Sequence, residues 1–387
     1  MIKTATLPRA ARVTQALSFL DRAADDAVSV QGWGRYYAVT SVASAYAKAG
    51  YVDKATEMIS GTLEGWERAG ALVDIAGALA YLGDLEGARA TAARVEDGSD
   101  RIVVDLSIAR AQVKAGDVAA AKAAAVAFAG EDRDVMLAVV AEEQARGGDV
   151  DGAKATAATI EGGWRRSSAL RDIAVGQAEA GDLQGAKVTA ATIEETECCR
   201  FRDEVAVALA RTQAKSGDIE AARATAASIG DFWLRDDALA VIAEAQAQAG
   251  DISAAKATAA RIGVQIPRAD ALGRIAVAQA RAGDLAGANR TAAVHRYVPE
   301  MAYALAEIAI LEAQAGDLES ATQTALGLDL YYGRPFALWG IAAAEVQAGG
   351  TDSLRAWAES LPDPYDRTYA FLGAADALLF GTEHQDR

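Results

Sequence analysis

The sequence predicts an all-α protein built from about ten antiparallel helix pairs with a period of 33 residues. Three observations predict it: an arginine recurs at intervals of 32 to 36 residues, a glycine follows 15 residues after nine of the ten arginines and after Met301, which fills one vacancy, and the segments between carry apolar residues at helical spacing. A fixed period of this length is typical of helical-repeat arrays, in which each pair buries its apolar stripe by stacking on its neighbours.

The recurring arginine is position 0 of each repeat, and Met301 takes its place once. A cation in the first turn of a helix opposes the helix dipole, so something must compensate it. Because the start of one helix in an antiparallel pair lies beside the end of the other, we expect each arginine to cap the last carbonyls of a neighbouring second helix. The alternative is a ladder of guanidinium groups offered to carboxylates or phosphates. The arginines are Arg35, Arg68, Arg101, Arg133, Arg166, Arg202, Arg235, Arg268, Arg334 and Arg367.

A glycine at position 15 marks the end of the first helix, helix A, and eight of the ten glycines are followed by aspartate. Glycine adopts the positive φ that ends a helix, and the aspartate side chain accepts the free N–H groups that start the next one, helix B. The dipeptides therefore predict a turn between helices A and B. The glycines are Gly50, Gly83, Gly116, Gly148, Gly181, Gly217, Gly250, Gly283, Gly316 and Gly349.

Apolar residues recur at positions 4, 7 and 8 of helix A, and helix B carries alanine at 20 and 24 and a larger aliphatic residue at 27. Each set forms one stripe on a helix. Alanine buries little surface but allows close packing of backbones, so the helices should be tightly spaced. In the repeat of Arg166 these residues are Leu170, Ile173, Ala174, Ala186, Ala190 and Ile193.

Two further columns are less regular. Position 11 is polar and shares the buried stripe of helix A, so its side chains need partners, and we expect bonds to the backbone or between glutamines of successive repeats, with ligand recognition as the alternative. Position −2 is often aromatic; we expect these rings to plug the turn between repeats, whereas an exposed row would be a binding edge. The polar column is Gln112, Gln144, Gln177, Gln213, Gln246, Gln279, Glu312 and Glu345, and the aromatic column is Trp33, Trp66, Trp164, Trp233, Tyr332 and Tyr365.

The whole pattern resembles the tetratricopeptide repeat: apolar at 4 and 7, small at 8, Gly-Asp at 15 and 16, alanine at 20, small at 24 and apolar at 27. The departures are the period of 33 rather than 34 and the replacement of the family's frequent aromatics by Leu170, Gln177, Ala190 and their equivalents. A divergent alanine-rich branch fits this pattern, and a helical-repeat family of its own is the alternative. The resemblance implies a right-handed α-solenoid that binds a partner on its concave face.

The resemblance also implies which side chains line that groove, namely A-helix positions 2, 5, 9, 12 and 13. Their mixture of cations and carboxylates suits an extended peptide or an acidic segment better than a nucleic acid. We therefore expect a non-catalytic interaction scaffold or adaptor for a peptide or protein partner, and a merely solvated face is the other interpretation. The candidate groove residues are Lys48, Arg110, Lys114, Glu142, Arg146, Arg171, Arg211, Lys215, Glu244 and Arg281.

One repeat departs from the pattern, because His295 occupies position 27 and Met301 replaces the arginine six residues later. A buried imidazole beside a missing cation is electrostatically consistent. The alternative function is therefore a small-molecule-binding protein, or an unusual enzyme, with its site in the solenoid hollow. The other interpretation is a neutral histidine with one hydrogen bond. The alternative site comprises His295, Arg296, Tyr297 and Met301.

The ends lack a full repeat. We expect an N-terminal capping helix in residues 1–30, a repeat array in 31–366, and a C-terminal capping helix and tail in 367–387. Residues 368–380 would be an eleventh helix A without a partner. Its apolar residues suggest a third hypothesis, self-association through this helix, and they are Tyr369, Phe371, Leu378 and Phe380.

Composition excludes several classes of protein. The net charge of −16 opposes nucleic-acid binding, and no stretch of 18 apolar residues indicates a membrane span, so we expect a cytoplasmic protein without a membrane partner. Two histidines are too few for a histidine metal cluster or a Ser-His-Asp site, enzyme signatures are mostly absent, and no cofactor or metal is expected. Cys198 and Cys199 are adjacent, which is poor geometry for a disulfide, and a thiol role is weakly supported.

Overall fold

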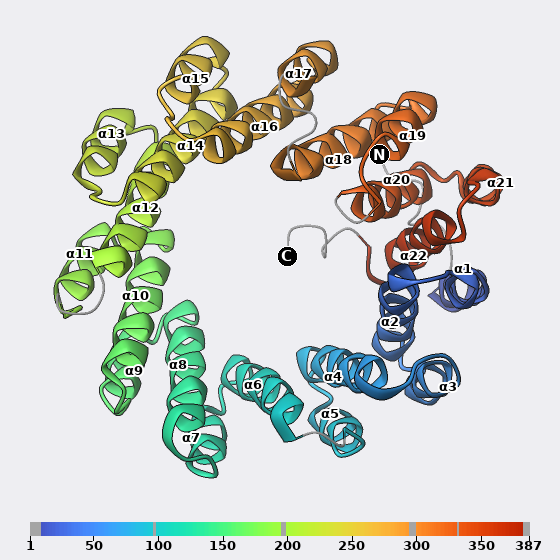
Figure 1. Cartoon of the computed structure of the whole chain (residues 1–387), viewed down its shortest axis with the longest axis horizontal. Coiled ribbons are helices and arrows are strands. Elements are labelled where there is room, and N and C mark those ends of the chain that lie inside the picture. The colour runs from blue at the N-terminus through green and yellow to red at the C-terminus, as the bar shows by residue number, and fades with distance from the viewer. Residues whose placement is uncertain (1–8, 96–97, 195–198, 294–298, 331–332, 382–387) are drawn as a thin grey trace. The chain divides into compact units, whose positions relative to one another are not determined.

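The computed structural model describes residues 9–95, 98–194, 199–293, 299–330 and 333–381 (Figure 1). Throughout these ranges the regular secondary structure is α-helical, without strands. The predicted all-α repeat fold is confirmed. The handedness of the array and its 33-residue period stay predictions, as does the division of the chain into two caps and an array.

Long and short helices alternate along the chain. The long helices, of 15 to 17 residues, are the A helices: α2 (Trp33–Lys48), α4 (Gly65–Tyr81), α6 (Gly98–Lys114), α8 (Gly130–Arg146), α10 (Gly163–Glu179), α12 (Cys199–Lys215), α14 (Phe232–Gln248), α16 (Gln265–Arg281), α18 (Pro299–Gln314), α20 (Arg334–Ala348) and α22 (Pro364–Phe380).

The short helices, of 8 to 11 residues, are the B helices, and a helix of 21 residues, α1 (Arg9–Ser29), precedes them all. The B helices are α3 (Val52–Thr62), α5 (Leu85–Ala92), α7 (Val118–Val126), α9 (Val150–Ala157), α11 (Leu183–Ala191), α13 (Ile219–Ser228), α15 (Ile252–Ala259), α17 (Leu285–Ala292), α19 (Leu318–Leu326) and α21 (Thr351–Ser360).

The chain divides into two compact units. Unit 1 comprises Met1–Ala78 and Ala276–Arg387, and unit 2 comprises Leu79–Ile275. In unit 2 the B helices α7, α9, α11 and α13 each pack on their own A helix and on the next one, and successive A helices from α6 to α14 pack on each other. Successive B helices of the described part lack comparable contacts, so unit 2 curves with its A helices on the inner side (Figure 1).

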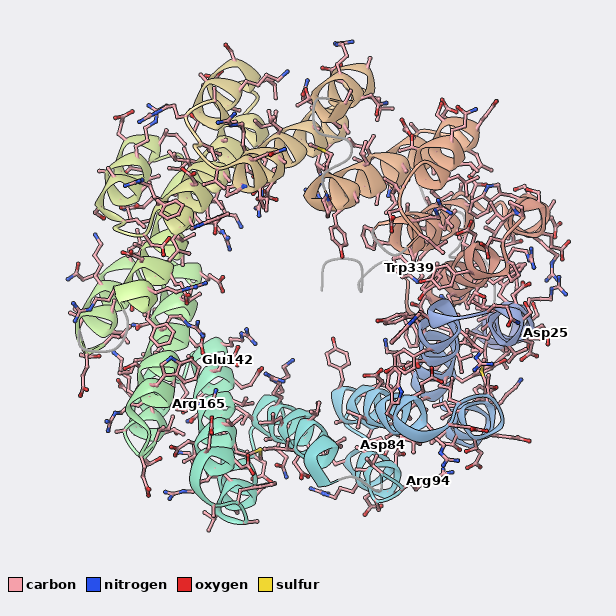
Figure 2. The ribbon with its side chains drawn as sticks, in the orientation of Figure 1. Asp25, Asp84, Arg94, Glu142, Arg165 and Trp339 are labelled. Carbon is pink, nitrogen blue, oxygen red and sulfur yellow. The ribbon has the colours of Figure 1, made fainter. Side chains whose placement is uncertain are left out.

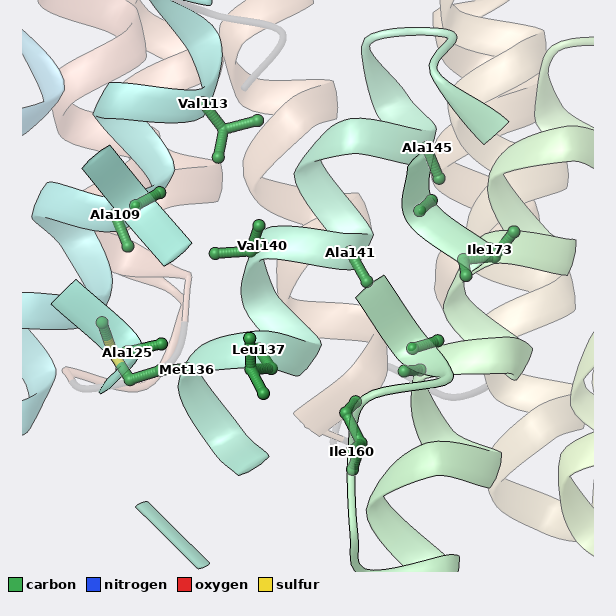
Figure 3. Close-up of a cluster of buried hydrophobic side chains, with 14 residues drawn as sticks. Ala109, Val113, Ala125, Met136, Leu137, Val140, Ala141, Ala145, Ile160 and Ile173 are labelled. Carbon is green, nitrogen blue, oxygen red and sulfur yellow. The ribbon is translucent and has the colours of Figure 1, made fainter. Parts of the chain in front are cut away.

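The core of unit 2 is formed by alanine-rich contacts between neighbouring helices, which we call alanine seams. Figure 3 shows one cluster, in which Ala141 and Ala145 of α8 are buried together with Met136, Ile160 and Ile173. Small side chains at these seams let neighbouring helices approach closely, while one large aliphatic residue per repeat fills the space beneath each turn. This is the packing that the apolar columns predict.

The turns between helices A and B follow the predicted chemistry. Gly181 has φ 88° and the N–H of Asp182 donates to Gln177 O at 2.9 Å, which closes helix A. The Asp182 side chain then accepts from Gly185 N at 2.8 Å, which starts helix B. Seven further aspartates of this column cap their B helices in the same way, Asp84, which Figure 2 labels at the start of α5, among them.

The arginine at position 0 caps the B helix that precedes it. Arg268 Nε and Nη2 donate to Ile262 O at 2.9 and 2.6 Å, and Arg334 makes the same pair of bonds to Leu328 O at 3.0 and 2.6 Å. Ile262 and Leu328 lie in the turn just after the B helix, and Arg334 Nη2 also donates at 3.0 Å to Leu326 O, the last residue of α19 at the negative end of the helix dipole. Arg367 donates to the C-cap residue Leu361 of α21, and Arg202 bonds to Ile193 in the turn after α11. The predicted capping is confirmed at Arg334 and Arg367.

The glutamine column joins the two helices of one hairpin. Gln177 Nε2 donates to Asp182 Oδ2 at 2.9 Å, and Gln177 Oε1 accepts from Thr189 Oγ1 at 2.5 Å. The expected bonds to the backbone or between glutamines are therefore wrong, because the partner is a threonine at position 23 of helix B. The same bond joins Thr156 to Gln144, Thr225 to Gln213, Thr258 to Gln246 and Thr291 to Gln279.

One repeat lacks this bond, and the defect gives a stability prediction. Ala124 stands where the repeats of the other five glutamines have threonine, and the buried Gln112 Oε1 has no hydrogen-bond partner. We expect Ala124→Thr to raise the free energy of unfolding by about 1 kcal/mol, because it supplies the missing donor. Denaturant unfolding measures the change, and Ala124→Val is the control of equal shape without a donor. Equal effects of the two substitutions would contradict the assignment.

An aspartate at position 1 ties successive repeats together. Asp236 Oδ2 accepts from Gly263 N at 3.0 Å and from Val264 N at 2.9 Å, both in the turn that leads to the next helix A. Asp134 and Asp203 make equivalent bonds. Sequence analysis missed this column because it is filled in only some of the repeats.

The two ends of the chain pack on each other within unit 1. Helix α1 packs along α22, and α22 also packs on α20 and α2. Phe19 and Phe371 are fully buried and stack with ring centroids 6.0 Å apart, and Arg367 Nε donates to Asp26 Oδ1 at 2.8 Å. The expectation of a last helix A without a partner is therefore wrong, because α1 fills the place of its helix B. Phe371 and Leu378 are buried in this contact, so neither is available to a second copy of the chain.

Candidate binding site

The aromatic column at position −2 is largely exposed. Trp33 is 69% exposed, Trp66 62%, Trp164 47% and Trp233 43%, so the expectation that these rings plug the turns is wrong at all four positions. Tyr365 is buried as expected. The exposed rings instead contact aromatic neighbours in the next repeat or turn, as Trp33 does with Trp66 at 6.0 Å between centroids.

In unit 1 two residues of this column, Trp33 and Tyr365, line an aromatic pocket. The pocket has a volume of about 620 Å³ and is contributed by the N-terminal turn of α2 together with α18, α20 and α22. Six of its eight lining residues are aromatic, and four of those six carry a phenolic hydroxyl. The lining residues are Trp33, Tyr37, Tyr303, Gly333, Pro335, Phe336, Tyr365 and Tyr369.

Two glycines allow the helices to meet here. A Cβ on Gly34 would lie 3.2 Å from Val30 Cγ1 and 3.3 Å from the Tyr365 ring, so glycine lets the start of α2 approach α22. Gly333 has φ 83°, and a Cβ there would lie 2.7 Å from Ala302 O of α18. Both positions precede a position-0 arginine and therefore begin a helix A.

A smaller hollow of about 270 Å³ adjoins the pocket and shares Phe336 with it. Arg281, a candidate groove residue, lines it and forms an ion pair with Glu307 of α18. Trp339, labelled in Figure 2 on α20, also lines it, and its indole N–H donates to Asp376 Oδ2 at 3.2 Å. The A-helix face thus contributes to a recess at this point.

The charges beneath the pocket are paired. Arg334, which caps Leu328, also lies with Nη1 3.6 Å from the buried Asp366 Oδ2. Burial raises the pKa of Asp366 to about 6, with Asp363 adding to the rise while Arg334 and Arg367 oppose it. Asp366 Oδ1 has no hydrogen-bond partner. At neutral pH the ionised Asp366 carboxylate therefore lowers the free energy of unfolding.

That cost predicts a pH dependence. Between the ordinary pKa of 3.8 and the folded value of about 6, the folded chain holds the Asp366 proton that the unfolded chain has released. The contribution of Asp366 to the free energy of unfolding is largest below pH 3.8. It falls by about 3 kcal/mol as the pH rises through 6. We expect Asp366→Asn to remove this fall, so that the unfolding free energies of wild type and variant diverge from pH 4 to 7. A pH-independent difference would contradict the prediction.

In unit 2 five of the eight candidate groove residues form ion pairs within the chain. Arg146 Nη2 lies 2.8 Å from Glu142 Oε1, and Nη2 of Arg110, in the preceding repeat, lies 3.8 Å from the other Glu142 oxygen. Arg171 lies 2.6 Å from Glu204 of the next repeat. Glu142 is labelled on α8 in Figure 2. These side chains form pairs within and between repeats rather than a strip of free cations.

The remaining candidates differ in their partners. Glu244 accepts from Arg274 at 2.7 Å, and Lys114 Nζ lies 5.4 Å from the centre of the Tyr81 ring. Lys48, Arg211 and Lys215 form no ion pair with the described part of the chain, and Lys48 and Lys215 are exposed. The structure thus pairs six of the ten candidates with neighbouring charges and leaves the other four without an ion pair in the described part of the chain, and a partner-binding role stays a prediction.

The residues of the alternative site are only partly visible. His295, Arg296 and Tyr297 lie outside the described residues. Met301 is fully buried in α18, and Tyr303, two residues further on, lines the aromatic pocket. Cys198 also lies outside the described residues, and Cys199 is the first residue of α12.

The described residues contain neither a metal-binding cluster nor a membrane-spanning helix. Histidine, cysteine and carboxylate side chains gather nowhere among them in a group of three that could hold a metal ion. The described helices include none with the length and apolar character needed to cross a membrane.

Comparison with known proteins adds little to this picture. No family model and no curated protein matches the chain, so the resemblance to tetratricopeptide repeats is not confirmed. Among solved structures, Ton1535 from Thermococcus onnurineus NA1 is similar at 17% identity, covering 85% of this chain and 96% of that one, with a TM-score of 0.26. A circular tandem repeat protein with novel repeat topology and enhanced subunit contact surfaces matches at 13% identity, covering 95% and 87%, with a TM-score of 0.14. Both likenesses are too weak to support an inference.

Proposed function

We propose that this protein is a non-catalytic interaction scaffold that binds a peptide or protein segment, with one partner side chain anchored in the aromatic pocket. The observation that carries the proposal is the pocket itself, an open recess of about 620 Å³ lined by six aromatic residues. Large aromatic side chains contribute much of the binding energy of protein interfaces. Exposed apolar patches on a protein surface commonly mark interaction sites.

The aromatic surface continues beyond the pocket. Trp66 of α4 contacts Trp33 and also Tyr36, with 5.5 Å between the latter ring centroids. On the other side, Phe336 stacks on Trp339, which lines the adjoining hollow with Arg281. An extended segment anchored in the pocket would therefore find aromatic contacts on one side and polar contacts on the other.

A selection experiment tests this proposal. A library of random 12-residue peptides is displayed, selected on the wild-type protein and counter-selected on Trp33→Ala. Trp233→Ala is the matched control, because Trp233 holds the same column position in unit 2 and does not line the pocket. We expect peptides that bind the wild type and Trp233→Ala with equal affinity and bind Trp33→Ala at least tenfold more weakly, since anchor residues are worth 2 kcal/mol or more, about 30-fold. Failure to obtain any Trp33-dependent peptide would contradict the proposal.

The second candidate function is a small-molecule-binding protein with its site in the same pocket. The pocket volume favours it, because ligand pockets typically span about 300–1,000 Å³ and are lined by apolar and aromatic side chains. The site would lie beside Tyr303 of α18, close in sequence to the irregular residues His295 and Met301. A free ligand that binds through Trp33 while no peptide does so would favour this candidate.

A further inference from the structure

One exposed aromatic ring at position −2 in unit 2 is covered by a cation of the chain itself. The Arg165 guanidinium carbon lies 4.7 Å from the centre of the exposed Trp164 ring, and that of Arg171 lies 5.1 Å from the buried Phe201 ring. Trp164 holds position −2 of its repeat, and Arg165 holds position −1. In this repeat the sequence therefore supplies both the ring and the cation that stacks on it.

In the pocket of unit 1, the exposed aromatic rings have no cation of the described residues stacked on them. Position −1 is Gly34 after Trp33, and it is Gly333 in the repeat of Arg334. Among the described residues, no cation lies over the rings of Trp33, Tyr303 or Phe336, all of which are exposed. The same aromatic column is thus left open where it lines the pocket.

Two cations of the repeats that form the pocket are already engaged. Arg334 donates to Leu328 O and lies beside Asp366, and Arg367 donates to Leu361 O and to Asp26. The chain as a whole carries a net charge of −16, which favours a positively charged partner through long-range attraction. The negative charge of the chain thus favours a cation that is supplied by a partner.

We propose that the aromatic pocket binds a guanidinium or alkylammonium group, carried by an arginine or lysine in a basic segment of a partner protein. The proposal rests on the proposed function and adds the chemistry of the anchor. The ring faces attract the cation, and the phenolic oxygens of Tyr37, Tyr303 and Tyr369 are acceptors for its N–H groups. Phosphate-bearing ligands are excluded as anchors, because aromatic faces repel anions and Arg334 is engaged.

Two probes of equal shape isolate the charge. Tetramethylammonium and neopentyl alcohol are titrated separately, and the indole N–H signal of Trp33, assigned from the Trp33→Phe spectrum, is followed by NMR. We expect tetramethylammonium to shift this signal with an affinity about 3- to 30-fold higher than that of neopentyl alcohol, the range of a cation–π contact. We also expect no change in this ratio with Trp233→Ala. Equal or tighter binding of neopentyl alcohol would overturn the proposal.

The selected peptides distinguish this inference from the function on which it rests. We expect arginine or lysine at the position whose replacement by norleucine abolishes Trp33-dependent binding. Trp33-dependent peptides anchored by an aliphatic or aromatic residue would overturn the cation proposal and leave the interaction scaffold intact. Tetramethylammonium binding without any Trp33-dependent peptide would overturn the partner proposal and favour a small ammonium ligand.

Discussion

Phe371→Ala is expected to lower the free energy of unfolding of unit 1 by about 3–5 kcal/mol, the range for removing a fully buried phenylalanine. Phe371 is completely buried in α22 and stacks on Phe19 of α1, so the substitution leaves a cavity where the two chain ends meet. Because α22 contributes Tyr365 and Tyr369 to the pocket, the variant should also bind Trp33-dependent peptides more weakly.

Denaturant unfolding followed by circular dichroism measures this effect, and Phe232→Ala is its control. Phe232 is 53% exposed at the start of α14, so its loss should cost less than about 1 kcal/mol. Equal costs for the two substitutions would show that the chain ends do not pack as described.

Gly373→Ala should have a comparable or larger effect although alanine is the better helix former. A Cβ on Gly373 would lie 2.0 Å from Trp339 O and 2.6 Å from Trp339 C, which are backbone atoms of α20. The two helices must separate to admit the methyl group, and we expect a loss of about 3 kcal/mol or more together with loss of peptide binding.

The matched control for this substitution is Gly61→Ala. Gly61 lies within α3, is exposed, and has no neighbour within 4 Å of an added Cβ. Alanine there should raise the free energy of unfolding by up to about 1 kcal/mol, because it only improves helix propensity. A stabilising Gly373→Ala would contradict the close approach of α20 and α22.

The local chemistry of the repeats could be predicted from sequence. Gly181 and Asp182 carry their turn and cap within five residues, and Arg268 caps a carbonyl only six residues away, so spacing alone indicates these bonds. Thr189 was missed although a threonine follows the glutamine by 12 residues in five repeats. That regularity was a usable signal.

The candidate site could not be predicted in the same way. Trp33 and Tyr303 are 270 residues apart, and they line one pocket because α22 packs on both α2 and α20 and α20 packs on α18, a contact between the chain ends that no repeat pattern encodes. Exposure also depends on neighbours: Tyr365 and Trp33 share position −2, yet only Tyr365 is buried. Likewise, Arg110 and Arg171 are paired because the stacking of α6 on α8 and of α10 on α12 brings carboxylates of the next repeat beside them.

The most direct test of the central claim, that α1 supplies the missing helix B of α22 and so completes the pocket, is a circular permutation. In the permuted chain residues 31–387 are followed by 1–30, so that α1 follows α22 as every other helix B follows its helix A. Denaturant unfolding of this chain should give a free energy within about 1 kcal/mol of the wild-type value, because the same contacts form from a reordered chain. A permuted chain that fails to fold cooperatively, or that unfolds with several kcal/mol less free energy, would contradict the claim.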